Sequence, residues 1–246
     1  MSQAVQKSLR KLKAVDQSRQ EFVSNVSHEL KTPITSIRVL ADSLMGMEDA
    51  PVELYREFMA DISDEIDREN QIIEDLLTLV RMDKSAESQM NISQVHINHE
   101  LEMILKRLRP IARKKDVEVV FESVRPVVAE VDEVKMTLIM TNLVENAIKY
   151  NKDHGWVKVI LDADHQYFTF EVSDSGIGIP EEALAHICER FYRVDKSHSR
   201  EIGGTGLGLA ITKSAVLMHK GSLTVTSTEG QGSCFLVKIP LTYIAS

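Results

Sequence analysis

A helical hydrophobic pattern that continues through residues 1–82 with a single interruption is the feature that most limits how this chain can fold. Apolar residues recur at steps of three and four over 5–44 and again over 54–80. Gly46 and Pro51 lie between the two stretches and are typical of a turn. The pattern predicts two long helices joined as a hairpin. Because one narrow apolar stripe stabilises a hairpin poorly, we expect two copies to pair into a four-helix bundle.

Each predicted helix has one apolar face. On the first helix it comprises Phe22, Val26, Leu30, Ile34 (with Pro33 beside it), Ile37, Ala41 and Leu44. On the second it comprises Leu54, Phe58, Ile62, Ile66, Ile73, Leu76 and Val80. We expect both faces to be shielded from water, because an amphipathic helix turns its apolar stripe toward the core.

The rest of the chain has a mixed pattern. The polar stretch 83–91 predicts a linker. Beyond it we expect helices at 101–111, 134–150 and 207–219, and strands at 117–121, 156–161, 167–172, 223–227 and 234–239. This mixture of helices and strands predicts a separate α/β sandwich domain.

Charge and cysteine content exclude several classes of protein. The chain has 29 basic and 37 acidic residues, a net charge of −8, which argues against direct binding of nucleic acid. No stretch approaches the roughly 18–20 apolar residues of a membrane-spanning helix. The only cysteines are Cys188 and Cys234, which excludes a disulfide framework and favours a reducing compartment.

A histidine stands on the polar side of the first predicted helix. His28 follows Val26 by two residues, about 200° around the helix, so it is expected to face water. Thr32 lies one turn further along, and Pro33 deprives the carbonyl of Glu29 of its helical partner. An exposed imidazole beside a carboxylate suits a nucleophile, although an ordinary surface histidine fits the same residues.

The helix expected at 134–150 carries a polar stripe. Asn142, Asn146 and Tyr150 recur every four residues, with Glu145 and Lys149 beside them. Amide oxygens suit Mg²⁺ and an ammonium group suits phosphate, so the stripe fits a nucleotide site. A solvated helix face explains the same residues equally well.

Two glycine-rich segments have the composition of ligand-binding loops. In the first, Asp174 offers an acceptor of the kind that an adenine amino group requires, and Gly176 and Gly178 permit a tight turn. The second opens the helix expected at 207–219 and comprises Gly204, Thr205, Gly206, Leu207 and Gly208. Free N–H groups at a helix start suit phosphates. This loop lacks the G-K-[S/T] sequence of a P-loop.

Two arginines precede the second glycine loop. Arg190 and Arg193 flank two aromatic residues, and the polar stretch 195–202 follows them. We expect that stretch to form a lid over a bound nucleotide.

Six motifs in this order resemble the cytoplasmic core of a bacterial sensor histidine kinase. FVSNVSHELKTPITSI is similar to the phosphoacceptor box, NLVENAIKY to the asparagine box and DSGIGIP to the first glycine box. ERFYRVD is similar to the phenylalanine box, GGTGLGLAI to the second glycine box and GQGSCF to a third. The resemblance covers essentially all of residues 16–246.

The resemblance implies a dimeric four-helix bundle followed by an α/β two-layer sandwich of the Bergerat type. Its divisions are an incoming signalling helix at 1–20, a dimerisation and histidine phosphotransfer hairpin at 21–86, and a catalytic ATP-binding domain at 87–246. It also implies a cytoplasmic location and a membrane anchor outside this sequence.

The resemblance further implies a role for each motif residue. His28 takes the γ-phosphoryl group of ATP, Glu29 handles the proton on the other ring nitrogen, and Thr32 positions water for dephosphorylation of the partner. Arg190 or Arg193 stabilises the transferring phosphate. Asn146 holds Mg²⁺, and the remaining nucleotide contacts come from Asn142, Lys149, Tyr150, Asp174, Gly176, Gly178 and the loop Gly204–Gly208.

The implied activity is autophosphorylation of a homodimer, followed by transfer to an aspartate of a response-regulator receiver domain. Two alternatives remain open. One is an ATPase of the gyrase and MutL type, although such enzymes place a glutamate base where this chain has Asn142. The other is a catalytically silent scaffold that only docks a receiver.

Overall fold

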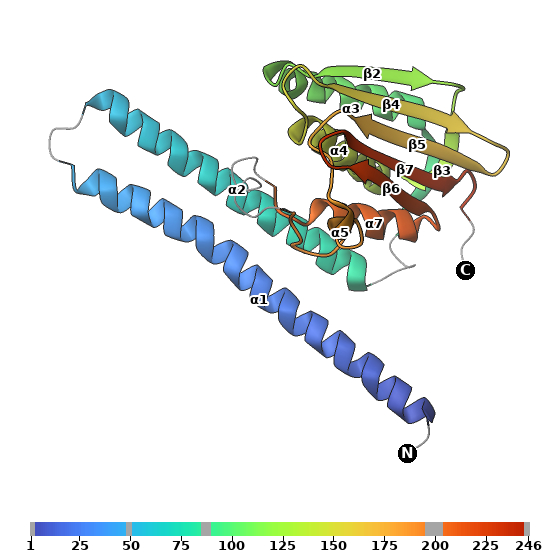
Figure 1. Cartoon of the computed structure of the whole chain (residues 1–246), viewed down its shortest axis with the longest axis horizontal. Helices are drawn as coiled ribbons and strands as arrows, with labels where there is room; N and C mark the ends of the chain where they lie inside the picture. The colour runs from blue at the N-terminus through green and yellow to red at the C-terminus, as the bar shows by residue number, and fades with distance from the viewer. Residues whose placement is uncertain (1–2, 48–50, 85–89, 195–203, 244–246) are drawn as a thin grey trace. The chain divides into compact units, whose positions relative to one another are not determined.

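The computed structural model describes residues 3–47, 51–84, 90–194 and 204–243. The chain divides into two compact units, a helical unit at Met1–Leu76 and a sandwich unit at Leu77–Ser246 (Figure 1). None of the described helices is long and apolar enough to cross a membrane.

Two long helices make up the N-terminal part of the chain. α1 spans Gln3–Met45 and α2 spans Val52–Lys84, so the predicted helical hairpin is confirmed. At the hairpin end, the Tyr55 hydroxyl donates to the Met47 carbonyl at 3.0 Å. The predicted linker begins later than expected, because its first two residues belong to α2, and 85–89 lie outside the described residues.

The buried stripe of α2 differs in phase from the prediction. Residues of low exposure recur at steps of three and four, at Phe58, Ile62, Glu65, Glu69, Ile72, Leu76 and Leu79. Within one copy of the chain, Ile66, Ile73 and Val80 have exposed fractions of 45%, 40% and 37%, so their shielding stays a prediction for the pairing of two copies. The observed stripe follows a strict seven-residue repeat and includes two glutamates. A prediction based on hydrophobicity alone does not assign glutamates to such a stripe.

α1 shows a similar offset at one position within a single copy of the chain. Ile34 is 57% exposed, whereas the preceding Pro33 is buried. Leu30 and Ile37 are both half-buried. Steps of three and then four residues therefore join Leu30, Pro33 and Ile37 into one stripe, and Ile34 is not part of that stripe.

The sandwich unit contains a five-stranded sheet and a two-stranded sheet. The strands are β1 Ile92–His96, β2 Glu118–Ser123, β3 Val128–Asp132, β4 Trp156–Ala163, β5 Tyr167–Asp174, β6 Ser222–Thr228 and β7 Gly232–Pro240. The large sheet has the order β2-β4-β5-β7-β6, with β2 parallel to β4 and the other neighbours antiparallel. β1 and β3 form the small antiparallel sheet.

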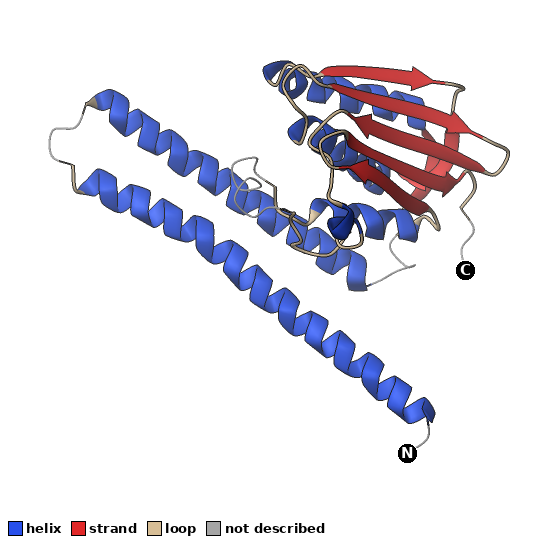
Figure 2. Cartoon of the chain, in the orientation of Figure 1, coloured by secondary structure: helices blue, strands red, loops and turns tan. Residues whose placement is uncertain are grey.

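The helices of this unit cover one face of the large sheet. They are α3 Ile97–Lys114, α4 Glu133–Lys149, the short α5 Glu181–Leu184, and α7 Gly208–Met218. Figure 2 shows α3, α4 and α7 on the same side of the strands. The predicted α/β sandwich is therefore confirmed, and only β1, β3 and α5 were not expected from the sequence.

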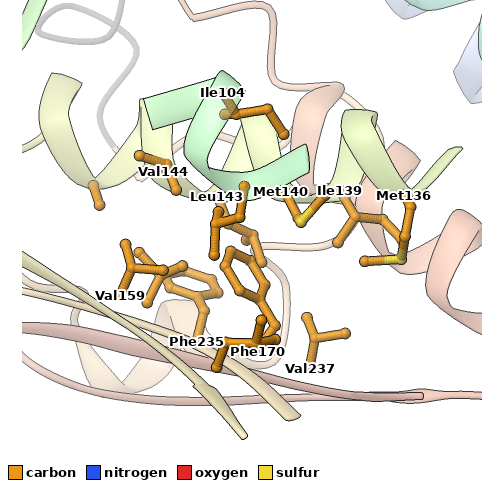
Figure 3. Packing of buried hydrophobic residues seen from close by; sticks show 14 of the residues in the cluster. Ile104, Met136, Ile139, Met140, Leu143, Val144, Val159, Phe170, Phe235 and Val237 are labelled. Carbon is orange, nitrogen blue, oxygen red and sulfur yellow. The ribbon is translucent and has the colours of Figure 1, made fainter. Parts of the chain in front are cut away.

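Side chains along the strands alternate between buried and half-buried, and α4 packs against the buried face. Phe168, Phe170 and Val172 of β5 are fully buried, and the residues between them are half-buried. Met140 and Leu143 of α4 pack over this face (Figure 3). Burying each large apolar side chain contributes on the order of 2 kcal/mol, so α4 is a firm base for any site built on it.

A buried histidine ties the end of α7 to the start of α4. The His219 ring donates through Nδ1 to the Ala215 carbonyl at 2.8 Å, and its Nε2 accepts the Asp132 N–H at 3.0 Å. The Asp132 carboxylate caps α4 by accepting from the Lys135 N–H at 3.1 Å. It also pairs with the Lys135 ammonium at 2.7 Å and accepts from the Asn91 N–H at 2.9 Å.

The buried His219 ring leads us to expect that the free energy of unfolding depends on pH. Burial lowers the pKa of His219 below its ordinary value of 6.5, so below about pH 6.5 the unfolded chain takes up a proton that the folded chain resists. The free energy of unfolding should be fully present above that pH and fall as the pH approaches the lowered folded pKa. Urea unfolding at about pH 7.5 and about pH 5.5 measures this fall.

His219→Gln is the matched control, because its amide oxygen can accept the Asp132 N–H without titrating. We expect the difference in stability between the two pH values to be smaller in the variant than in the wild type. Equal differences in the two proteins would contradict a role for His219 in the pH dependence.

Candidate functional site

His28 is exposed on α1, as predicted, and the helix around it is rich in local hydroxyl bonds. The Thr32 hydroxyl donates to the His28 carbonyl at 3.1 Å. The Ser27 hydroxyl donates to the Val23 carbonyl at 2.9 Å, one turn earlier, and Thr35 makes the same kind of contact one turn later. Such bonds compete with the backbone ladder, so this part of α1 is intrinsically easier to bend than its flanks.

Pro33 adds to this local weakness. It lies inside α1, which continues without a break to Met45. Proline has no N–H, so the carbonyl of Glu29 lacks its partner four residues ahead. Glu29 itself is half-buried beside the exposed imidazole of His28.

A buried carboxylate stands at the end of β5. Asp174 is 8% exposed, and its Oδ1 accepts the N–H groups of Gly176 at 2.8 Å and Ser233 at 3.3 Å. Within the described part of the chain, its Oδ2 accepts no hydrogen bond. Burial raises the pKa of this carboxyl, and the two backbone donors oppose that rise. The free oxygen suits a ligand that carries an N–H donor.

Glycines allow the turn after Asp174 to approach its neighbours closely. A Cβ on Gly176 would lie 2.3 Å from the Tyr150 carbonyl oxygen. Gly178 has a φ of +68°, and a Cβ there would lie 2.1 Å from the Thr228 carbonyl oxygen. The Ile177 N–H donates to the Tyr150 carbonyl at 3.1 Å and anchors the turn on the end of α4.

The polar stripe of α4 is partly used in packing. The Asn142 amide donates to the Gly208 carbonyl at 3.2 Å and to the Thr212 hydroxyl at 3.4 Å, so it links α4 to α7. The Lys149 ammonium pairs with Glu145 at 3.0 Å.

Asn146 differs from the other residues of the stripe. Its half-buried side chain makes no hydrogen bond with any described residue of the chain. Its amide oxygen therefore has no competing hydrogen bond among the described residues, and neither amide atom of Asn146 is tied to α7, whereas the Asn142 amide nitrogen is.

The second glycine loop is fastened to the segment that carries the arginines. The Phe191 N–H donates to the Gly206 carbonyl at 2.9 Å, and Arg193 donates through its guanidinium to the Gly204 carbonyl. Gly206 has a φ of +71°, and a Cβ there would lie 3.0 Å from the Phe191 backbone. Arg190 is half-buried in the same segment.

The rest of the loop leads into α7. Leu207 is fully buried, and its N–H donates to the Thr205 hydroxyl at 3.2 Å. Gly208 begins α7, which has no side-chain cap at its start. The lid expected at 195–202 lies outside the described residues.

Almost all the predicted nucleotide residues gather on joined elements of the sandwich unit: the end of β5, α4 and the start of α7. His28, Glu29 and Thr32 lie on α1, in the helical unit. Sequence reasoning missed Asn151 and Ser175, which link the Asp174 turn to α4, and Lys115, which donates to the Lys149 carbonyl. The available signals were that Asn151 directly follows the asparagine motif and that Ser175 lies within the first glycine motif.

Comparison with known families identifies the family of the chain. Residues 18–85 match the family described as His Kinase A (phospho-acceptor) domain. Residues 131–243 match the family described as Histidine kinase-, DNA gyrase B-, and HSP90-like ATPase. This chain belongs to the sensor histidine kinases. The second family includes gyrase, but the adjoining phosphoacceptor match belongs to the kinases.

The kinase likeness extends over nearly the whole chain. The sensor protein kinase WalK of Staphylococcus saprophyticus is 38% identical over 229 residues, which is 92% of this chain and 37% of that protein. This chain thus spans little more than a third of the length of that relative. Full-length ShkA in complex with AMPPNP is 25% identical with a TM-score of 0.67, over 92% of this chain and 47% of that one.

A third similar structure supports the fold. It is the histidine kinase ThkA in complex with the response regulator protein TrrA, with a TM-score of 0.73 and 22% identity. The likeness covers 96% of this chain and 67% of that chain. The helical hairpin and the mixed α/β ATPase domain of this sensor histidine kinase are thereby confirmed.

Proposed function

We propose that this sensor histidine kinase chain transfers the γ-phosphoryl group of ATP to His28 and then to an aspartate of a response-regulator receiver domain. The observation that carries the proposal is the exposed imidazole of His28 within the phosphoacceptor match. In this proposal residues 1–20 bring in the signal, 21–86 dimerise and accept phosphate, and 87–246 bind ATP.

The purine end of the nucleotide is assigned to Asp174. Its unused Oδ2 would accept the adenine amino group, while Gly176 and Gly178 let the backbone approach the base. The solved complex of ShkA with AMPPNP supports adenine-nucleotide binding in a related fold.

The phosphate end is assigned to α4 and the second glycine loop. Lys149 and Tyr150 would line the site with Asn142, and the N–H groups of 204–208 would meet the phosphates. Arg190 or Arg193 would neutralise charge on the transferring group.

The unbonded amide oxygen of Asn146 fits a hard cation, so Asn146 would hold Mg²⁺. When bound, Mg²⁺ supplies positive charge to the phosphate oxygens. The chain's own contribution at this point is to present that oxygen from a rigid, core-packed helix.

The chemical step requires a neutral imidazole. A ring nitrogen of His28 forms a bond to the γ-phosphorus as the bond to the bridging oxygen breaks, and ADP leaves with that electron pair. Glu29 would orient the ring through the proton on its other nitrogen. The receiver aspartate then takes the phosphoryl group, and the freed imidazole is restored. Thr32 would position a water molecule for the opposing reaction, in which the phosphorylated receiver is dephosphorylated.

Homodimerisation is assigned to the second apolar stripe of the hairpin. Met59, Ile66, Ile73 and Val80 recur at intervals of seven residues along α2, and their exposed fractions are 58%, 45%, 40% and 37%. A seven-residue apolar repeat is the signature of helices that pair with another helix, so this stripe suits a second copy of the chain.

The fate of labelled phosphate tests the proposal against hydrolysis. We expect incubation with Mg²⁺ and γ-labelled ATP to leave label on the protein that is stable in alkali and labile in acid. Asn142 cannot serve as the base that activates water, which supports transfer to the protein. Release of free phosphate without protein label would favour a gyrase-type ATPase. Failure to bind nucleotide would favour a docking scaffold.

A further inference from the structure

Asn151 is a buried polar hub just past the end of α4. It is 7% exposed, and its amide nitrogen donates to the Ala147 carbonyl and to the Trp156 carbonyl, each at 3.0 Å. Its amide oxygen accepts from the Lys152 N–H at 3.0 Å and from the Ser175 hydroxyl at 3.0 Å. All four of its hydrogen-bonding positions are therefore filled.

These bonds join three segments that the nucleotide site depends on. Ala147 lies in the last turn of α4, Trp156 begins β4, and Ser175 directly follows Asp174. The Ser175 hydroxyl also accepts the Trp156 N–H at 2.8 Å, which closes a ring of hydrogen bonds. The carboxylate that faces the purine is thus one residue from a side chain held by Asn151.

The fit around the hub is tight. A Cβ on Gly155 would lie 2.0 Å from the Asn151 amide oxygen and 2.8 Å from the Ser175 hydroxyl. Only glycine at this position leaves room for Asn151 and Ser175 to meet. The local backbone is therefore shaped around that contact.

We propose that Asn151 is a positioning residue that sets the Asp174 carboxylate relative to α4 and thereby determines the preference for a 6-aminopurine nucleotide. This inference rests on the proposed role of Asp174 in binding adenine. α4 carries the residues assigned to the phosphate end, so the distance from α4 to Asp174 fixes which base fits once the phosphates are bound. Ser175 transmits the position, because it bonds to Asn151 and adjoins Asp174.

Replacing Asn151 with aspartate is the sharpest perturbation. Asn151→Asp keeps the shape and the acceptors for Lys152 and Ser175 but loses both donated bonds. It also sets a carboxylate oxygen against the Ala147 and Trp156 carbonyls. A buried acceptor that faces other acceptors is unfavourable, so the side chain at position 151 is expected to move until a donor or a water molecule can satisfy it.

The experiment compares autophosphorylation by the full chain with ATP and with inosine triphosphate, which has a carbonyl oxygen in place of the adenine amino group. For Asn151→Asp we expect the KM for ATP to rise about tenfold and kcat at saturating ATP to stay within about twofold. The KM for inosine triphosphate should change little, so the preference for ATP falls. Asn70→Asp, an exposed asparagine on α2, is the matched control and should retain the wild-type preference.

Ser175→Ala is the second variant, because it removes the transmitting hydroxyl and leaves the Asn151 bonds to α4 and β4 in place. We expect a rise of about threefold in the KM for ATP, and no further loss when it is combined with Asn151→Asp. The thermal midpoint of Ser175→Ala should stay close to that of the wild type.

Three outcomes overturn the inference. An equal rise in KM for both nucleotides would mean general damage, and an unchanged preference for ATP in both variants would mean that Asn151 does not position Asp174. If the wild type itself does not prefer ATP, the role of Asp174 in the proposed function fails as well. The wild-type measurement therefore separates failure of the proposed function from failure of the inference alone.

Discussion

His28→Gln is expected to take up no detectable phosphoryl label from γ-labelled ATP, a loss of at least about a thousandfold in rate. Glutamine fills a similar volume, but its amide has no nucleophilic lone pair, so the bond to phosphorus cannot form. Because His28 is exposed on α1, the variant should fold and bind nucleotide like the wild type. Label retained on the protein and ADP affinity, measured by titration calorimetry, are the two readouts.

His99→Gln provides the matched control for this experiment. His99 is also exposed, but it lies on α3 in the sandwich unit and outside the phosphoacceptor match. Its variant should be labelled at the wild-type rate. Label that survives in His28→Gln would show that another residue accepts the phosphoryl group and would remove the central assignment.

Asp174→Asn is expected to weaken ADP binding by about a hundredfold and to suppress autophosphorylation in proportion. The amide oxygen can still accept from Gly176 and Ser233. The amide nitrogen, which is a donor, would then face the adenine amino group, which is also a donor. A donor facing a donor in a buried site loses the hydrogen bond and leaves both groups unpaired. Calorimetric titration with ADP measures the loss.

The same variant is expected to be no less stable than the wild type, and this separates loss of binding from loss of folding. Burial raises the pKa of Asp174, so the folded chain binds its proton more tightly than the unfolded chain does. The ionised carboxylate therefore costs stability at pH values above the raised pKa, and the neutral amide avoids that cost. Thermal unfolding at neutral pH is the measurement.

An exposed aspartate supplies the control for this pair of measurements. Asp153→Asn changes the charge by the same amount near the end of α4 and should leave ADP affinity unchanged. A large fall in the thermal midpoint of Asp174→Asn would mean that the carboxylate supports the fold. Unchanged ADP affinity would mean that it does not face the base.

Much of the architecture was accessible from local pattern. The period of three and four residues in α1 and α2, and the alternation in β4 and β5, each arise from neighbours along the chain, so both were predicted with small errors at the ends. The phase of the α2 stripe was not. Within one copy of the chain, Glu65 and Glu69 lie in the half-buried stripe while Ile66 and Ile73 are exposed, and a seven-residue repeat can include such polar residues.

The residues of the candidate site could be recognised in the sequence, because the chemistry proposed for them depends on their own functional groups. The imidazole of His28, the carboxylate of Asp174 and the amide of Asn146 are recognisable in sequence, and so is their order. The hub at Asn151 and the link from His219 to Asp132 join residues up to 87 positions apart through buried hydrogen bonds. Such bonds depend on how the sheet and helices come together, so the folded structure was needed to find them.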